Sequence, residues 1–401
     1  MTPGSRGRAW PRYPGPVNTV RLGIIGMGNI GKYHADYLLR GQVTRAQLTA
    51  VADALAPLEP WAAKGLRTFQ DGGELIQSGA VDAVLIATPH YQHTTLGIAA
   101  LEAGLHVMVE KPVSVHKADA ERLIAAHARH PKQVFAAMFQ LRTEPRYLKM
   151  KKLISEGELG ELVRVSWIIT DWFRTEIYYA SGGWRATWKG EGGGVLLNQC
   201  PHNLDILAWL CGLPARVRGF CQLGRYHQIE VEDNVTAYLE WASGATGVFI
   251  TSTGEAPGTN RFEICGTRGK LVLENNRLTF TRNETDMVAF SQAAKAGFAR
   301  PDVWHVEVPF DNAPAQHATL TQNLVDAILD GAPLIAPAAE GLHSVELANA
   351  SLYSSLTGQT VELPLDGAAY ERKLQGLIAG SKFEKKVVEI RDEDFTKSFV
   401  R

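Results

Sequence analysis

The chain has 401 residues, 42 acidic and 41 basic side chains, and an ordinary globular composition with 45% hydrophobic and 21% charged residues. The length predicts two to three domains, and a net charge near zero gives no reason to expect nucleic acid or an anionic membrane surface as a partner. No apolar run approaches the roughly 18 residues of a membrane span, and four cysteines without metal-ligand spacing are typical of free thiols in a reducing compartment. We therefore expect a cytoplasmic protein without a metal site.

The first 18 residues, MTPGSRGRAWPRYPGPVN, are rich in Pro, Gly and Arg and lack the apolar segment of a secretory signal. We expect the range 1–18 to be a flexible extension that takes no part in the fold.

A nucleotide cradle is predicted next. In VRLGIIGMGNIGKYHADYLL, Gly26, Gly28 and Gly31 have GxGxxG spacing between an apolar strand and a helical pattern. These glycines permit a tight turn, close approach of a pyrophosphate and close helix packing, and the helix N-terminus presents free N–H groups to the phosphates. Such turns also occur without a nucleotide, but here an acid, Asp53, ends a second strand about 20 residues on, as dinucleotide binding requires. Asp53 favours NAD over NADP, because it can bind ribose hydroxyls and repels a 2′-phosphate.

Strands and helices continue to alternate up to Gln140. Apolar strands over 81–89, 105–112 and 133–140 are separated by helical patterns over 90–104 and 116–130. This order predicts a doubly wound parallel sheet over 19–140, which binds ligands where its strands end. A lysine ending a buried strand, Lys111, is unusual and points to a site, although a solvent-facing or capping lysine is equally compatible with the pattern. The expected cofactor contacts are Gly26, Gly28, Asn29, Ile30, Gly31, Asp53, Thr88, Pro89, His93, Glu110 and Lys111.

The pattern of predicted helices and strands changes after Gln140. A helix and a long strand are followed, from Val217, by strands whose hairpin turns fall at 243–244, 267–269 and 275–276, and two helices are expected near 315–329 and 340–356. Antiparallel strands after a βαβ half predict a second, α+β domain over 141–365. The range 366–401 is a tail without a predicted structure.

A glycine-rich loop over 173–191 holds Tyr178, Tyr179, Trp184, Arg185 and Trp188. Aromatic faces stack on sugar C–H groups and an arginine fork donates to hydroxyls, so the loop favours a carbohydrate ligand. A hydrophobic cluster that holds a long loop in place would have the same composition.

The segment 190–212, GEGGGVLLNQCPHNLDILAWLCG, predicts an apolar helix with polar residues in one row. Spacings of four and three place Asn198, His202 and Asp205 on one helical face. His202 could act as a general acid/base, with Asp205 orienting it or binding backbone. Alternatively Asn198 is the helix N-cap, Pro201 lies in the first turn, and His202 is a buried core residue.

Taken together, the motifs resemble the Gfo/Idh/MocA family of sugar oxidoreductases over roughly 20–364. The motifs that carry the resemblance are GIIGMGNIGKYHADYL, ATPHYQH, EKPVSV, GELGELVRV, GGGVLLNQCPHNLDILAWLCG and LIAPAAEGLHSVELANASLYSSLTG. The resemblance implies a Rossmann domain and a second domain built on an open-faced, largely antiparallel sheet, which joins copies into a homodimer or homotetramer.

The resemblance also implies the chemistry, an NAD(P)-dependent oxidation or reduction of a sugar hydroxyl. It assigns Lys111 to the substrate near the nicotinamide, and the family's acid-to-histidine pair falls on Asn198 and His202. The first member is Asn where the family has Asp, and NQxPHNLD resembles a subgroup linked to sugars and glycosides, sometimes through C3 oxidation. The catalytic candidates are Lys111 and His202, and the substrate-binding candidates are Asn198, Trp184, Arg185, Trp188, Tyr178 and Arg142.

We thus expect an NAD-dependent oxidoreductase that transfers a hydride between nicotinamide and a secondary hydroxyl or ketone of a cyclic sugar, glycoside or inositol-like polyol. NAD-assisted cleavage or epimerisation of a glycoside, without net redox change, would use the same residues. A non-catalytic nucleotide sensor is the third possibility, against which the presence of both Lys111 and His202 argues.

Overall fold

The computed structural model describes residues 19–311 and 316–388, so the expected extension at 1–18 lies outside the described residues. Within them, the first sheet has six parallel strands in the order β3-β2-β1-β4-β5-β6. This order is that of dinucleotide-binding sheets and confirms the predicted doubly wound fold. The strands are β1 (Val20–Ile25), β2 (Ala46–Ala52), β3 (Arg67–Phe69), β4 (Ala83–Ile86), β5 (His106–Val109) and β6 (Phe135–Ala137).

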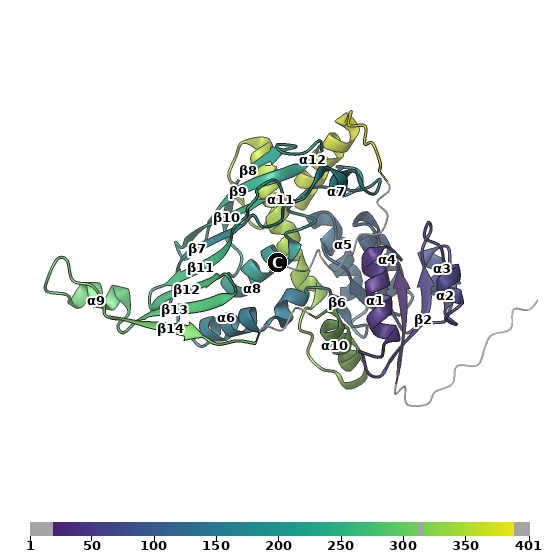
Figure 1. Ribbon diagram of the computed structural model, residues 1–401, viewed down its shortest axis with the longest axis horizontal. Coiled ribbons are helices and arrows are strands. Elements are labelled where there is room, and N and C mark those ends of the chain that lie inside the picture. The colour runs from purple at the N-terminus through teal and green to yellow at the C-terminus, as the bar shows by residue number, and fades with distance from the viewer. Residues whose placement is uncertain (1–18, 312–315, 389–401) are drawn as a thin grey trace, which may run out of the picture.

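Helices cover both faces of this sheet (Figure 1), and its central strands are therefore mostly apolar. All four residues of β4, Ala-Val-Leu-Ile, are buried. The connecting helices are α1 (Asn29–Leu39), α2 (Glu59–Ala62), α3 (Gly72–Gln77), α4 (Tyr91–Glu102) and α5 (Lys117–Ala128), and the short turn η1 (Gln140–Thr143) leads out of the sheet.

The second sheet has nine strands in the described part of the chain, in the order β14-β13-β12-β11-β7-β10-β9-β8-β15. The β7–β10 pair is parallel and the other pairs are antiparallel, as the prediction of a largely antiparallel sheet requires. Asn275 and Asn276 both have positive φ (47° and 56°), the backbone of a tight hairpin turn. The strands are β7 (Leu162–Ile169), β8 (Arg216–Leu223), β9 (Glu232–Glu240), β10 (Thr246–Ser252), β11 (Asn260–Gly266), β12 (Gly269–Glu274), β13 (Arg277–Asn283), β14 (Val303–Val308) and β15 (Val361–Glu362).

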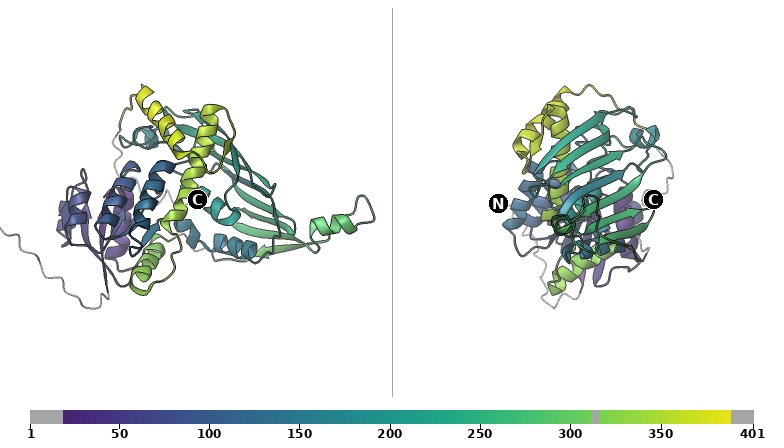
Figure 2. Two further views of the ribbon diagram at one scale, coloured as in Figure 1. Left: turned by 180° about the vertical axis from the view of Figure 1, so that it is seen from behind. Right: turned by 90° about the vertical axis from the view of Figure 1, so that its left-hand side faces the viewer.

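Helices α8 (Pro201–Cys211) and α11 (Gly341–Thr357) lie between the second sheet and the nucleotide domain, and α11 packs against both α8 and α5 (Figure 1). Helix α6 (Pro145–Ser155) lies beside them, and η2 (Ala338–Glu340) precedes α11. The sheet's opposite face carries no packed helix among the described residues (Figure 2). Helix α9 (Met287–Ala293) projects from the β13–β14 hairpin, away from both domains (Figures 1 and 2).

The helix expected over 190–212 is shorter than predicted. It begins at Pro201, and its N-cap is Cys200 rather than Asn198. The preceding glycines pack too closely for a helix: a Cβ on Gly194 would lie 1.9 Å from the carbonyl oxygen of Glu232. The Glu232 carboxylate accepts the N–H groups of Gly194 and Leu196, which fixes this stretch as turns. Asn198 therefore precedes the helix that carries His202 and Asp205, although Pro201 does lie in the first turn as predicted.

One helix from the range 141–365 joins the nucleotide domain instead of the second. Helix α10 (His317–Asp330) packs against β1, β5 and α1, and its Leu320, Leu324 and Val325 are buried in the same apolar cluster as β1. Helix α12 (Gly367–Gly380), in the tail that the sequence left unassigned, packs on α5. Among the described residues, no helix combines the length and apolarity of a membrane span.

Candidate active site

A cavity of about 2750 Å³ opens at the carboxyl ends of the first sheet's strands and extends to the second domain. Ligands bind at this edge in doubly wound folds. The two domains thus bring together most of the residues singled out in the sequence. Those that line the cavity are Gly26, Gly28, Asn29, Ile30, Asp53, Thr88, Pro89, His93, Glu110, Lys111, Tyr178, Trp184, Arg185, Asn198 and His202.

The glycine turn has the geometry of a pyrophosphate cradle. Gly26 has φ +98°, and a Cβ there would lie 2.6 Å from the Ala87 backbone; a Cβ on Gly31 would lie 1.9 Å from the Gly26 carbonyl oxygen. A Cβ on Gly28 would meet no protein atom within 4 Å, because this residue faces the cavity. Gly28 is also the N-cap of α1 and supplies no side-chain acceptor, so the first N–H groups of α1 are available to a phosphate.

Asp53 lies at the adenosine end of this cradle, directly after β2. Its Oδ2 accepts the Met27 N–H at 2.6 Å and its Oδ1 accepts those of Leu55 (2.8 Å) and Ala56 (2.7 Å). Burial opposes ionisation, but these three N–H groups lower the pKa of Asp53 below its ordinary value. A fixed carboxylate at this position fits a ribose diol.

Two buried side chains fix the turns on either side of Lys111. The His93 ring lies 2.7 Å from the Pro112 carbonyl oxygen and 2.8 Å from that of Thr88. Glu110 Oε1 lies 2.7 Å from His34 Nε2. Burial acts to raise the pKa of Glu110, but the contact with His34 outweighs it and the pKa is lowered. The strand end that carries Lys111 is therefore held from both sides.

Lys111 and His202 reach the cavity from different domains. Lys111 Nζ donates to the Asn198 carbonyl oxygen at 2.9 Å, and burial lowers the pKa of this lysine. His202 Nε2 lies 3.2 Å from Nε2 of Gln140, and the ring meets Phe139 edge-on with centroids 6.0 Å apart. An ammonium and an imidazole thus face one space beside the nucleotide cradle.

A polar network connects Asn198 to the glycine-rich loop over 173–191, called the aromatic loop below. Tyr178 Oη donates to Asn198 Oδ1 at 3.2 Å and accepts from Arg185 at 2.7 Å. The Asn198 amide donates to Glu191, whose other carboxyl oxygen accepts the Ala186 N–H at 2.6 Å. Burial raises the pKa of Glu191. A carboxyl group therefore stands behind Asn198, and Arg185 is placed with its guanidinium over the rings of Tyr178 and Trp184.

Two of the predicted substrate contacts, Arg142 and Trp188, do not line the cavity. Arg142 is 2% exposed and does not line the cavity; its guanidinium binds Asp205 at 2.6 and 2.8 Å and contacts Glu340. This pairing also accounts for Asp205, which neither orients His202 nor binds backbone in this structure. Trp188 is 3% exposed, belongs to the core of the second domain, and contributes its carbonyl oxygen to Tyr91. For Trp188, packing of the loop is the correct interpretation.

Four further residues belong to the site by position: His90, Gln140, Glu191 and Gln199. Each is next to a sequence feature already singled out, His90 and Gln140 at strand ends and Glu191 and Gln199 beside the glycine run and Asn198. Gln199 donates to Tyr178 Oη at 2.9 Å, and the His90 ring meets Trp184 edge-on at 5.5 Å. The sequence places them near the site but gives no sign of which side chain points inward.

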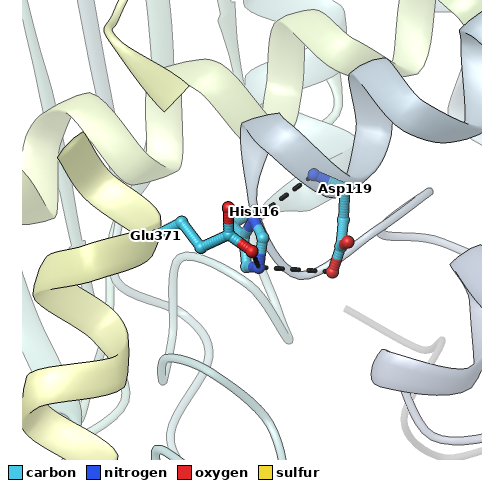
Figure 3. A group of neighbouring side chains, drawn as sticks. All are labelled: His116, Asp119 and Glu371. Atoms are coloured by element: carbon cyan, nitrogen blue, oxygen red, sulfur yellow. Dashed lines mark hydrogen bonds and ion pairs between the residues drawn. The ribbon is translucent and has the colours of Figure 1, made fainter. Parts of the chain in front are cut away.

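A second polar cluster lies away from the cavity, where α5 meets α12 (Figure 3). His116 Nε2 is 3.2 Å from Asp119 Oδ2 and 3.7 Å from Glu371 Oε1, a grouping that resembles a set of metal ligands. Arg122 contacts both carboxylates, at 2.8 Å for Glu371. The guanidinium supplies the positive charge that the two acids need, so the cluster joins the helices as an ion-pair network.

This combination of a nucleotide cradle and a facing sheet domain defines a two-domain, dinucleotide-dependent oxidoreductase. Residues 20–138 match the oxidoreductase family with an NAD-binding Rossmann fold, and residues 147–272 match the GFO/IDH/MocA C-terminal domain. The chain belongs to the Gfo/Idh/MocA family of NAD-binding oxidoreductases.

Known proteins similar to this chain include two curated dehydrogenases. An inositol 2-dehydrogenase of Rhizobium meliloti is 27% identical over 84% of this chain and 97% of its own. A scyllo-inositol 2-dehydrogenase (NAD(+)) of Bacillus subtilis is 27% identical over 63% of this chain and 73% of its own. Among solved structures, the WlbA dehydrogenase of Chromobacterium violaceum, in complex with NADH and UDP-GlcNAcA, is 27% identical, with a TM-score of 0.74 over 87% of this chain and 97% of the other.

Proposed function

We propose that this protein is an NAD-dependent dehydrogenase that transfers a hydride between nicotinamide and a secondary hydroxyl or ketone of a cyclic polyol, sugar or glycoside. The observation that carries the proposal is the meeting of Lys111 and His202 in the cavity that also holds the glycine cradle and Asp53. The similar dehydrogenases described above act on inositols or were crystallised with a nucleotide sugar and NADH, which supports a cyclic polyhydroxy substrate.

The cradle and Asp53 would hold NAD by its pyrophosphate and its adenosine ribose. When bound, the nicotinamide accepts or returns the hydride. His202 takes the proton of the reacting hydroxyl and returns it in the reverse direction, a task for which an imidazole is suited because it titrates near neutral pH. Lys111 places a positive charge beside the oxygen on which negative charge develops.

The remaining residues orient the ring. The amide of Asn198, supported by Glu191 and Tyr178, can bind a hydroxyl neighbouring the reacting carbon. Arg185 supplies guanidinium donors on the same side, and the indole of Trp184 offers a flat face for C–H groups of a sugar.

A panel of myo-inositol, scyllo-inositol, free sugars and glycosides, followed at 340 nm with NAD and NADP, tests the proposal. We expect NADH to accumulate with at least one ring compound and to fall to background in the Lys111→Ala/His202→Ala double variant. Product that forms without NADH would instead indicate cleavage or epimerisation with retained cofactor. No reaction with any compound, from a protein that binds NADH, would contradict the dehydrogenase assignment.

We further propose that the open face of the second sheet joins copies of the chain into a homodimer or homotetramer. This face presents Phe220 and Tyr238, which are 56% and 39% exposed, beside the half-buried Ile250 and Ile168. Light scattering should give a mass above that of one chain, and Tyr238→Lys combined with Ile250→Glu should return the protein to a monomer.

The four cysteines are all free, which supports the cytoplasm as the compartment.

A further inference from the structure

The C-terminal segment after α12 reaches the cavity. Residues 381–388 run along the aromatic loop, and the Val388 N–H donates to the Ala180 carbonyl oxygen at 3.0 Å. Val387 and Val388 line the cavity, although they lie almost 190 residues after Asn198 in the chain. The rest of the wall at this end includes Tyr178, Ser181, Gly182, Trp184 and Arg185.

Lys385 fixes this segment to the loop. Its Nζ donates to three backbone carbonyl oxygens, those of Ser181 (3.3 Å), Gly182 (2.5 Å) and Arg185 (2.8 Å). Burial, with Arg185 nearby, lowers the pKa of Lys385 to about 8, so the ammonium stays largely charged at neutral pH. At the start of the segment, Ser381 donates to Glu230, whose other carboxyl oxygen accepts the Trp188 N–H at 2.8 Å. The segment is thus fixed to the second domain at both ends.

The hydroxyl groups of an unsubstituted polyol need hydrogen-bond partners, but the two valine side chains present only apolar surface. Val387 is 59% exposed and Val388 is 47% exposed, and both face the cavity that holds Lys111 and His202. Small-molecule sites are lined predominantly by apolar side chains that the bound ligand covers, and the two valines supply such a lining at this end of the cavity.

We propose that Val387 and Val388, held over the aromatic loop by Lys385, form a subsite for an apolar substituent of the substrate ring. This inference rests on the proposed dehydrogenase function and narrows its substrate to a substituted ring, such as an alkyl or aryl glycoside. The polar group Asn198–Arg185 binds the ring hydroxyls, and the valines with Trp184 cover the substituent.

The probes are the methyl and phenyl β-D-glucopyranosides and galactopyranosides, with myo-inositol as the unsubstituted ring. In the unmutated protein we expect kcat/KM for a phenyl glycoside to exceed that for the matching methyl glycoside about tenfold or more. Val387→Asn/Val388→Asn should remove most of this advantage, so that the phenyl and methyl glycosides have similar kcat/KM in the variant. Lys386→Ala, an exposed residue of the same segment that does not line the cavity, is the matched control and should change neither.

Two further measurements keep the outcomes distinct. NADH binding, followed by fluorescence, should be the same in all variants. Lys385→Gln should increase hydrogen exchange over 180–185 and lower the phenyl advantage together. Turnover of myo-inositol with no gain from a phenyl group, or a gain that survives the valine substitutions, would overturn the subsite and leave the dehydrogenase assignment standing. If no ring compound is oxidised, the dehydrogenase assignment itself fails, and the subsite with it.

Discussion

Lys111 Nζ and the backbone carbonyl oxygen of Asn198 are 2.9 Å apart, and this hydrogen bond joins the two domains inside the cavity that both residues line. The carbonyl is neutral and leaves the charge of the ammonium uncompensated at that contact, while burial lowers the pKa of the lysine. His202 lies four residues after Asn198, the residue whose carbonyl oxygen accepts this bond from Lys111. The positions of Lys111 and His202 therefore depend on the same short stretch, residues 198–202.

Lys111→Ala and His202→Ala should each lose most of kcat and remain folded. Loss of proton transfer by His202 is expected to cost about 10²–10⁴-fold, and loss of the charge at Lys111 a few kcal/mol of transition-state stabilisation. The effects should be far from additive in the double variant, because both groups serve one transition state. Lys189→Ala, an exposed lysine of the aromatic loop, is the control. Near-normal turnover of His202→Ala, with an unchanged pH profile, would make His202 a packing residue.

Cofactor choice should depend on Asp53. We expect the unmutated protein to prefer NAD, because the ionised carboxylate repels a 2′-phosphate. In Asp53→Asn, the kcat/KM values for NAD and NADP should lie closer together. The amide keeps one oxygen, which can still accept the N–H groups of Leu55 and Ala56 but not that of Met27 as well, so the turn should be loosened less than by alanine. Equal or better kcat/KM with NADP before mutation would rule this account out.

Arg142→Ala should reduce stability rather than substrate affinity. The substitution leaves Asp205 buried at 1% exposure without its ion-pair partner, and breaking a buried pair in this way costs about 3–5 kcal/mol in the free energy of unfolding. Urea unfolding measures this loss. Arg185→Ala supplies the contrast: KM for the sugar should rise while NADH binding and Tm stay close to normal. A raised sugar KM in Arg142→Ala at unchanged stability would restore the original assignment of Arg142 to the substrate.

Glu191→Gln should weaken substrate binding through Asn198. The carboxylate accepts both the Asn198 amide and the Ala186 N–H, and a glutamine can accept only one of them. We expect KM for the ring substrate to rise several-fold and the Kd for NADH to stay the same. Glu230→Gln, a change to another loop-anchoring carboxylate, tests whether any disturbance of the loop has this effect. If both variants raise KM equally, Glu191 has no specific role in placing Asn198.

Stability should fall with rising pH through the His227–Asp233 pair. His227 Nδ1 lies 3.0 Å from Asp233 Oδ2, and although burial acts to lower it, this contact raises the pKa of His227. A raised pKa means that the stabilisation is complete below the ordinary histidine value of about 6.5 and is lost as pH rises through the folded-state value. His227→Gln should therefore flatten the fall in unfolding free energy as pH rises above about 6.5. An unchanged slope in that variant would assign the pH dependence to other groups.

Local features of the fold could be predicted from the sequence. Gly26, Gly28, Gly31 and Asp53 act within one βαβ unit, and the Asn275–Asn276 turn depends only on its own backbone. Arg142 shows where such prediction ends, because its partner Asp205 lies 63 residues away and only the packed helices bring the two together. The surroundings of Trp188 could not be predicted either, because composition cannot separate an aromatic ring that faces a ligand from one that faces the core. Val387 and Val388 had no sequence signal, since nothing local indicates that a tail returns to a cleft.

The packing of α10 onto the first sheet has a consequence for how this chain can be divided. Leu320, Leu324 and Val325 close the apolar cluster that contains Val20 and Leu22, and Thr321 Oγ1 lies 2.7 Å from Tyr37 Oη. A fragment that stops at residue 140 would leave that surface bare to water and should aggregate. For the same reason, a chimaera with a relative needs three crossovers, one near residue 140 and one on each side of 317–330, because the nucleotide-binding unit is discontinuous in the sequence.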